Sequence, residues 1–249
     1  MPEFNTVAIL LLIALVILWN LDFVATLLTL GSLKPELPEE FVDTYNPAKY
    51  SQSQEYTRAT SRFGILSSIV SLTILLCFWF FGGFAWWDSC TRSLSLGGVS
   101  TGLIYVFGLL FGNYLLSLPL TIYATFILEG RFGFNKTTRA TFVMDQLKTI
   151  LLTALIGAPL LAGILLIFQN VPDAWLWAWL AFSVFILAIT YLAPSLIMPL
   201  FNKFEPMEEG TLKDAIYKMA KECEFPLTEI TVMDGSRRSA KSNAFFMGF

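Results

Sequence analysis

The chain has 249 residues, of which 55% are apolar and 14% are charged, and its mean hydropathy is +0.65. Ordinary soluble domains carry about 25% charged residues, so this composition excludes a soluble globular class for most of the chain. The net charge of −3 supplies no strongly basic surface of the kind that attracts nucleic acid, and we predict no nucleic-acid partner.

Long apolar runs dominate the sequence, and each approaches or exceeds the roughly 20 residues that cross a bilayer. They extend over residues 6–30, 63–87, 98–128, 151–168 and 174–200. Helices are expected there, because backbone polar groups in lipid must bond within their own segment. The alternating pattern of a β-barrel is not seen. We therefore predict a mostly α-helical, polytopic bundle in the lipid bilayer, with residues 1–200 as the transmembrane domain. The first run lacks a basic n-region, which favours a retained helix over a signal peptide.

The basic residues predict an orientation for these helices. Fifteen of the 16 lie in the segments 31–62, 129–150 and 201–249, whereas Arg92 alone lies on the other side. Lys and Arg favour the cytoplasmic side, so we expect the N-terminus outside and the C-terminal part in the cytoplasm. Tryptophans 86 and 87, predicted to end the second helix, and 175, 177 and 179, which begin the fifth, fall on the outer side, where an aromatic belt is typical.

A few polar residues lie inside the apolar runs. Asn20 and Asp22 belong to the first run and Asn113 to the third. Asp22 either extends to the interface or lines, with the others, a water-filled chamber within the bundle. The third run also carries the pairs Gly98/Gly102 and Gly108/Gly112, whose spacing favours close helix packing.

Two polar segments connect the runs in distinctive ways. Residues 45–62 are rich in Tyr, Ser, Gln and Thr, which indicates a solvated loop or a surface helix. Residues 129–136 place two glycines between aromatic residues, which predicts a tight, packed turn.

The chain changes character after Leu200. Apolar residues recur at helical spacing from Leu212 to Cys223, which predicts one amphipathic helix that Thr211 can cap. Residues 229–234 and 243–249 predict two strands, joined by a basic loop of small residues. Residues 201–249 are therefore expected to begin a cytoplasmic α+β domain.

Three segments resemble the CAAX prenyl protease 1 family. They are residues 126–137 with Glu-Gly-Arg-Phe-Gly-Phe-Asn-Lys, residues 193–204 with Ala-Pro-Ser-Leu-Ile-Met-Pro, and residues 234–249, where Gly-Ser-Arg-Arg-Ser precedes Ser-Asn-Ala-Phe. The resemblance is strongest after Phe126, and the first 100 residues match mainly in hydropathy.

The resemblance implies a seven-helix membrane zinc endoprotease that removes the C-terminal tripeptide of prenylated CAAX proteins. Five of those helices would lie in this chain. The family's zinc motif, His-Glu-x-x-His, would follow Phe249, and this sequence contains no histidine. We therefore expect an N-terminal portion with no catalytic residue and no metal ligand of its own. The resemblance places the substrate peptide along Asn243, Ala244 and Phe245, by strand addition.

The cysteines offer no alternative metal site, because Cys77, Cys90 and Cys223 share no CxxC spacing. Other function classes remain open on the residues alone. A non-catalytic membrane scaffold or a peptide-binding module is compatible with this chain. A transporter is less compatible, because the two halves show no internal repeat.

Overall fold

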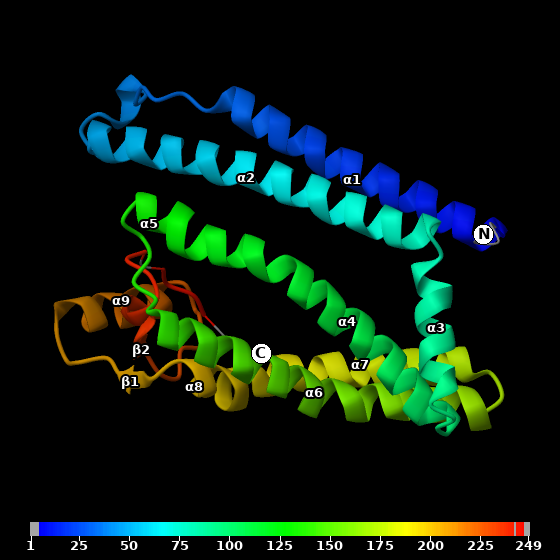
Figure 1. The fold of residues 1–249 in the computed structure, drawn as a ribbon. Helices are drawn as coiled ribbons and strands as arrows, with labels where there is room; N and C mark the ends of the chain where they lie inside the picture. Colours follow the sequence, from blue (N-terminus) through cyan, green and yellow to red (C-terminus); the bar gives the residue numbers. More distant parts are fainter. Residues whose placement is uncertain (1–4, 242, 247–249) are drawn as a thin grey trace. The chain divides into compact units, whose positions relative to one another are not determined.

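The computed structural model describes residues 5–241 and 243–246, which form two compact units, 1–135 and 136–249. The first unit contains α1 (Thr6–Ser32), a 3₁₀ turn (Glu39–Phe41), α2 (Pro47–Phe80), α3 (Gly83–Ser93), α4 (Gly98–Ile122), a π-helical stretch (Tyr123–Leu128) and α5 (Glu129–Arg131) (Figure 1). The second contains α6 (Arg139–Asn170), α7 (Ala174–Leu192), a π-helical stretch (Ala193–Ile197), α8 (Met198–Phe201), β1 (Phe204–Pro206), α9 (Thr211–Glu222), β2 (Thr231–Met233) and a 3₁₀ turn (Gly235–Arg237).

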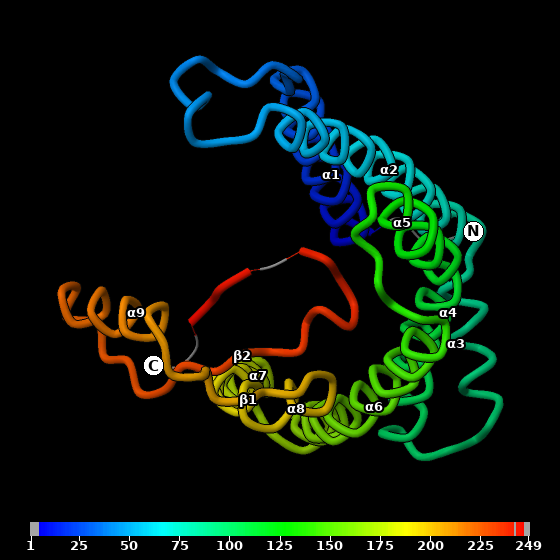
Figure 2. Tube along the Cα trace, turned by 90° about the vertical axis from the view of Figure 1, so that its left-hand side faces the viewer, coloured from blue at the N-terminus to red at the C-terminus, as the bar shows by residue number. Residues whose placement is uncertain are grey.

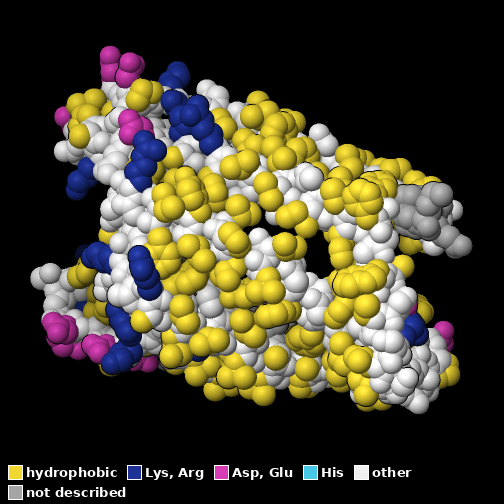
Figure 3. All heavy atoms as spheres, viewed as in Figure 1, with side chains coloured by type: hydrophobic (Ala, Val, Ile, Leu, Met, Phe, Trp, Pro, Cys, Tyr) yellow, Lys and Arg dark blue, Asp and Glu magenta, His cyan; other side chains and the backbone are white. Residues whose placement is uncertain are grey.

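The prediction of five membrane helices is confirmed. In the part of the chain that the structure describes, five continuous helical spans are long and apolar enough to cross a bilayer: Thr6–Ser32, Pro47–Phe80, Gly98–Arg131, Arg139–Asn170 and Ala174–Phe201. The most apolar stretch of each has 0% of its residues buried. Figure 3 shows apolar side chains along the visible lengths of the helices. Exposing that much apolar surface to water would cost about 25 cal/mol per Å², so lipid is the solvent that fits these helices.

The second span differs from its predicted limits at both ends. Asn46 caps α2, because its side chain accepts hydrogen bonds from the N–H groups of Ala48 and Lys49 at 2.9 and 3.2 Å. The polar residues 47–62 are therefore helical, in agreement with the surface-helix alternative. The span ends at Phe80, because Gly82 adopts a φ of +74°, which breaks the helix. The predicted helix end at residues 86–87 is therefore wrong, since these tryptophans lie in α3.

Helices α1 and α2 lie side by side in the first unit (Figures 1 and 2). The guanidinium group of Arg58 on α2 donates a hydrogen bond to the carbonyl oxygen of Leu33 at 3.2 Å. That carbonyl belongs to the residue that ends α1, where the last carbonyl groups have no partner within the helix. A polar side chain near the start of α2 therefore supplies a hydrogen-bond donor to a backbone carbonyl at the end of α1.

Of the glycine pair Gly108/Gly112 in α4, Gly108 alone lies in close contact with a neighbouring side chain. A Cβ at Gly108 would lie 2.2 Å from Cζ2 of Trp87 on α3, whereas a Cβ at Gly112 would meet nothing within 4 Å. The indole cannot move away freely, because its N–H donates to the carbonyl oxygen of Tyr105 at 2.9 Å.

We expect Gly108→Ala to destabilise the first unit by about 1–3 kcal/mol, because it forces Trp87 out of this contact. Gly112→Ala is the matched control in the same helix, and should be neutral or slightly stabilising, since Ala forms helix better than Gly. Unfolding of both variants in detergent micelles measures the difference. Equal stability of the two would contradict this packing account.

The fourth span also begins earlier than predicted. α6 starts at Arg139 rather than Leu151, and Thr138 caps it, because its hydroxyl accepts a hydrogen bond from the N–H of Thr141 at 3.1 Å. Its first three turns carry charged residues, which lower the hydropathy without breaking the helix. In the same unit, α6 and α7 pack against each other.

The tail confirms one predicted strand and corrects another. β2 lies within the predicted range 229–234 and pairs antiparallel with β1, with Glu205 opposite Val232. α9 also forms, but Gly210 stands at its N-cap position instead of Thr211. Residues 243–246 form no strand, because a strand requires a partner and, among the described residues, the sheet contains β1 and β2 alone. The remainder of that predicted strand, 247–249, lies outside the described residues.

Candidate functional site

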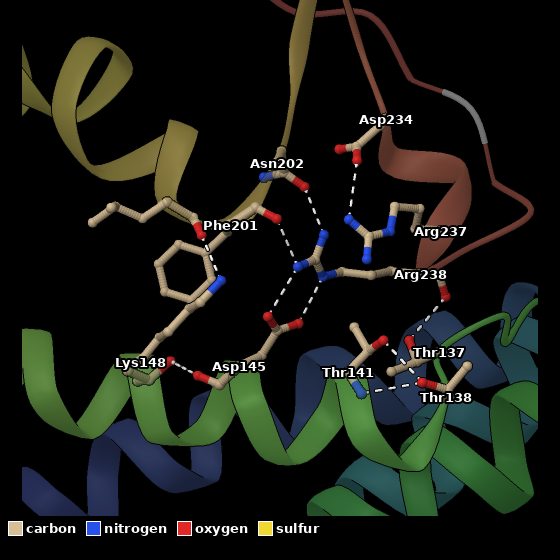
Figure 4. Close-up of polar contacts among 12 residues, drawn as sticks. Thr137, Thr138, Thr141, Asp145, Lys148, Phe201, Asn202, Asp234, Arg237 and Arg238 are labelled. Carbon is tan, nitrogen blue, oxygen red and sulfur yellow. Dashed lines mark hydrogen bonds and ion pairs between the residues drawn. The ribbon is translucent and has the colours of Figure 1, made fainter.

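The densest polar cluster of the second unit joins the start of α6 to the turn after β2. Figure 4 shows the Arg238 side chain extending from this turn toward Asp145 on α6 and toward the end of α8. Asp145 and Lys148 lie one turn apart on α6, so both side chains can serve the same face of the helix.

Arg238 makes a two-pronged contact with Asp145. Its Nε lies 2.7 Å from Oδ2 and its Nη2 lies 2.9 Å from Oδ1. The same guanidinium donates to Oδ1 of Asn202 at 2.9 Å and to the carbonyl oxygen of Phe201 at 2.7 Å. Four of its hydrogen-bonding directions are thus occupied, in the fork geometry that suits arginine rather than lysine.

This ion pair is shielded from solvent more than an ordinary surface pair. The side chains of Arg238 and Asp145 are 24% and 19% exposed. The hydrogen bonding that Arg238 donates to Asp145 raises the pKa of Arg238 above its already high ordinary value, so the guanidinium stays charged under all working conditions. Charge-assisted, bidentate contacts of this kind are stronger than neutral hydrogen bonds.

The backbone of Arg238 is fixed as well. Its carbonyl oxygen accepts from the N–H of Lys136 at 3.0 Å and from the hydroxyl of Thr137 at 3.1 Å. Arg238 therefore contacts residues just before α6, on α6 and after α8.

The turn that carries Arg238 is itself hydrogen-bonded to Lys203, the residue just before β1. The N–H of Lys203 donates to Oδ1 of Asp234 at 2.8 Å, and the N–H of Asp234 donates to the carbonyl oxygen of Lys203 at 3.0 Å. The N–H groups of Arg238 and Ser239 then both donate to the carbonyl oxygen of Gly235, at 3.0 and 3.1 Å. The neighbouring Arg237 contributes less, because its side chain is 58% exposed and lies 3.5 Å from Asp234.

Lys148 fixes the end of α8 from the next turn of α6. Its Nζ donates to the carbonyl oxygen of Leu200 at 2.7 Å and lies 5.8 Å from the centre of the Phe201 ring. The end of α8 is therefore held by Lys148 of α6 and by Arg238 of the turn after β2.

The predicted tight turn at residues 129–136 is confirmed, and its first half packs within the first unit. Gly133 has a φ of +73°, and the ring of Tyr56 meets the rings of Phe132 and Phe134 edge-on, at 5.3 and 4.9 Å. The Tyr56 hydroxyl donates a hydrogen bond to the carboxylate of Glu129.

We expect Tyr56→Phe to destabilise the first unit by about 1–2 kcal/mol, because the Glu129 carboxylate loses a hydrogen bond. Thermal unfolding in detergent measures the loss. Tyr45→Phe, at a position that is 58% exposed, is the control and should change stability by less than about 0.5 kcal/mol. A loss of similar size in both variants would rule out the specific contact.

The substrate residues predicted from the sequence lie after this cluster, in an exposed segment that belongs to no helix or strand. Asn243, Ala244 and Phe245 are all exposed, and the Asn243 side chain accepts a hydrogen bond from the N–H of Ala244 at 2.9 Å. The next residue, Phe246, packs its ring on Phe225 at 5.4 Å.

Sequence reasoning missed the residues that form the polar cluster around Arg238. Asp145 and Lys148 were assigned to a connecting loop, and Arg238 was noted only within the family motif. The capping Thr138 and the spacing of residues 138, 141, 145 and 148 carried the signal, because that spacing places them along one helical face.

The donor set of this chain does not fit a zinc site. The sequence contains no histidine, and Cys77, Cys90 and Cys223 are separate free thiols. Among the described residues, no group of three or more Cys, Asp or Glu side chains could hold a metal ion. Zinc in proteins takes three or four converging nitrogen, sulfur or oxygen ligands, and the described residues supply no such set.

Known proteins are similar to this chain in fold and in sequence. Residues 26–203 match the family described as CAAX prenyl protease N-terminal, five membrane helices. Among solved structures, Ste24p of S. mikatae superposes with a TM-score of 0.82 at 36% identity, covering 94% of this chain and 56% of that protein.

Two of the most similar sequences belong to the same family as the matching family model. CAAX prenyl protease 1 of Saccharomyces cerevisiae is 37% identical over 226 residues, which cover 86% of this chain and 49% of the relative. The probable CAAX prenyl protease 1 of Schizosaccharomyces pombe is 35% identical over 230 residues, which cover 87% and 48%. The chain thus spans about half the length of these relatives. By the family match and the shared five-helix fold, it belongs to the CAAX prenyl protease 1 family.

Proposed function

We propose that this chain is the membrane-embedded, substrate-presenting portion of a zinc metalloendopeptidase. In this proposal the complete enzyme removes the C-terminal tripeptide of prenylated CAAX-type proteins, or cleaves related membrane peptides. The observation that carries the proposal is the family match across the five membrane helices, residues 26–203. The residues of this chain would bind and present the peptide, and residues 201–249 would begin the cytoplasmic protease domain.

The zinc of such an enzyme would be held outside the residues of this chain. The family resemblance implies a His-Glu-x-x-His helix after Phe249, in which two histidines on one helical face bind the metal. When bound, the metal would lower the pKa of a water molecule that attacks the peptide. A chain without histidine offers no equivalent ligands.

The peptide would lie along Asn243, Ala244 and Phe245. The exposure of these residues, which belong to no helix or strand, supports this assignment, because exposed main-chain groups can bind a peptide by hydrogen bonding. The two-stranded sheet β1–β2 precedes the segment in the same unit.

A water-filled chamber within the membrane would give the peptide and water access to each other. Asn20, Asp22 and Asn113 are exposed polar residues in the membrane helices α1 and α4, which supports this part of the proposal. Such residues rarely face lipid and more often face water or protein. The amide of Asn20 also donates to the carbonyl oxygen of Val16 at 2.7 Å, which lowers the cost of its position.

A chimeric enzyme tests the proposed activity. Residues 1–249 would replace the matching part of the S. cerevisiae relative, and the product would be given a prenylated CAAX peptide. We expect zinc-dependent release of the tripeptide, abolished by a chelator and absent from residues 1–249 alone. A correctly folded, zinc-loaded chimera that binds the peptide without cleaving it would instead support the peptide-binding module, which the lack of metal ligands in this chain favours as the second candidate.

The proposed orientation predicts the outcome of a topology assay. We expect a reporter fused after Glu205 to be cytoplasmic and one fused at Asp173 to be external, because 15 of the 16 basic residues then lie inside. Figure 3 shows Lys and Arg gathered mainly at one end of the helices in each unit. Alkaline phosphatase and fluorescent-protein fusions at both positions give the readout. An external signal at Glu205 would reverse the orientation.

A further inference from the structure

An apolar groove of about 500 Å³ lies in the first unit, where α2 ends and α3 begins. One wall of this α2–α3 groove is the last part of α2, from Thr73 to Phe81, and the other is the start of α3, with Gly83 and Trp86. The volume falls within the range of small-molecule sites, about 300–1,000 Å³. Apart from the Thr73 hydroxyl, the Cys77 thiol and the Trp86 indole N–H, the lining groups are hydrocarbon, so the groove suits an apolar ligand.

The α2 wall of the groove is fixed by packing between the two helices. Gly82, with a φ of +74°, ends α2 and turns the chain into α3. A Cβ at Gly83 would overlap the ring of Phe78, so this glycine lets the ring lie against the start of α3. The ring of Phe84 meets those of Phe78 and Trp79 edge-on, at 4.9 and 6.1 Å. A wall that is already ordered lowers the entropic cost of binding a ligand.

The α3 wall is held from its other side. The Trp87 indole N–H donates to the carbonyl oxygen of Tyr105 on α4 at 2.9 Å, and Thr91, one turn further along α3, is only 1% exposed. Trp86 lines the groove and is 63% exposed. Helix α3 is therefore packed on the face of Trp87 and Thr91, while its Trp86 side chain is open to a ligand.

The groove lies at the depth of one leaflet of the bilayer. The apolar part of α2, residues 63–80, is about 27 Å long, close to the thickness of the hydrocarbon core. Thr73 stands near the middle of this length, and Phe81 stands at the end away from the basic residues Arg58 and Arg62. The wall from Thr73 to Phe81 covers about 13 Å along the helix, nearly half of the hydrocarbon core.

We propose that the α2–α3 groove binds one acyl chain of a bilayer phospholipid, in the leaflet away from the basic end of α2. The occupant follows from the surroundings, because α2 belongs to a membrane span and the groove has the length and the apolar lining that one chain in one leaflet needs. Lipid tails are as apolar as the side chains, so binding depends on close packing against the fixed aromatic walls. This inference is independent of the proposed function.

The prenyl group of a substrate is a less suitable occupant. Three membrane spans lie between the α2–α3 turn and the segment Asn243–Phe245, so the two are expected on opposite sides of the membrane. A prenyl group on a peptide bound at that segment would have to pass about half of the hydrocarbon core, roughly 15 Å, before it reached Thr73. An acyl chain of the groove's own leaflet enters it directly.

Photolabelling tests the lipid site without any catalysis. The 249-residue chain is placed in nanodiscs that contain a small fraction of phosphatidylcholine with a diazirine on one acyl chain, and mass spectrometry maps the adducts. We expect residues 73–86 to carry about 2- to 10-fold more label for each exposed apolar side chain than α1, as packing on aromatic rings implies. Helix α1 is the internal reference, because its Leu18 and Leu28 are 66% and 70% exposed. Label spread evenly over both regions overturns the inference.

Two matched variants test whether the groove itself causes the excess. Cys77→Trp places a large ring in the groove and should remove the excess label, whereas Leu18→Trp adds the same ring to an exposed position of α1 and should leave it unchanged. Circular dichroism confirms that both variants are folded, and the parent chain alone still decides if Cys77→Trp is not. Undiminished label in a folded Cys77→Trp overturns the inference.

A second probe separates the two apolar chains. A CAAX peptide with a diazirine on its farnesyl group is added to the same nanodiscs and is expected to label residues 73–86 no more than α1. Preferential labelling of these residues by the farnesyl probe, with displacement of the phospholipid probe, would assign the groove to the prenyl group and overturn the lipid assignment.

Discussion

Asn243→Ala in the chimeric protease is expected to lower kcat/KM about 5- to 150-fold, while the stability of the protein hardly changes. The rate estimate assumes the loss of one hydrogen bond to the peptide, worth about 1–3 kcal/mol in a desolvated site. The stability estimate follows from the structure. Asn243 is exposed, and its side chain accepts a hydrogen bond from the neighbouring N–H of Ala244. Its removal should cost less than about 0.5 kcal/mol.

The matched control for this variant is Asn170→Ala. Asn170 is also exposed, and its amide donates to the carbonyl oxygen of Leu166 in its own helix at 2.8 Å. It should leave cleavage unchanged. Kinetics and thermal unfolding are measured on the same preparations of both variants. Equal cleavage by Asn243→Ala and the parent chimera would remove Asn243 from the substrate-binding site.

The membrane helices were predictable because apolar length is a local property of the sequence. A run of about 20 apolar residues has few alternatives to a spanning helix. The first and last residues of the helices were less predictable where a helix extends into polar residues. α6 begins at Arg139 because Thr138 caps it, yet hydropathy falls over the charged turns that contain Asp145 and Lys148.

The site was harder to predict because its contacts join distant residues. Arg238 and Asp145 are 93 positions apart, and Tyr56 and Glu129 are 73 apart. The spacing of apolar residues along the sequence indicates helices and strands, but it does not indicate which distant side chains form a contact. The second strand was predicted from the composition of residues 243–249, but strand formation depends on a partner that composition does not specify. The family resemblance identified these residues as important without indicating what holds them.

Breaking the pair between Asp145 and Arg238 is expected to produce the largest loss of stability among the variants considered. Asp145→Ala leaves the Arg238 guanidinium partly buried with no carboxylate, and both side chains are less than a quarter exposed. Removing one partner of a fully buried pair costs about 3–5 kcal/mol, and a surface pair contributes about 0–1. An intermediate loss of about 2–4 kcal/mol is therefore expected for the second unit.

A double-mutant cycle separates the pair from its other contacts. Asp145→Ala and Arg238→Ala are measured singly and together by unfolding in detergent, and the coupling energy should exceed about 1 kcal/mol, since the two side chains share two hydrogen bonds. The cycle of Asp234 and Arg237 is the control, because that pair is 3.5 Å apart and its arginine is 58% exposed. Its coupling should stay below about 1 kcal/mol. Similar coupling in both cycles would mean that the contact between Arg238 and α6 is no stronger than an ordinary surface ion pair.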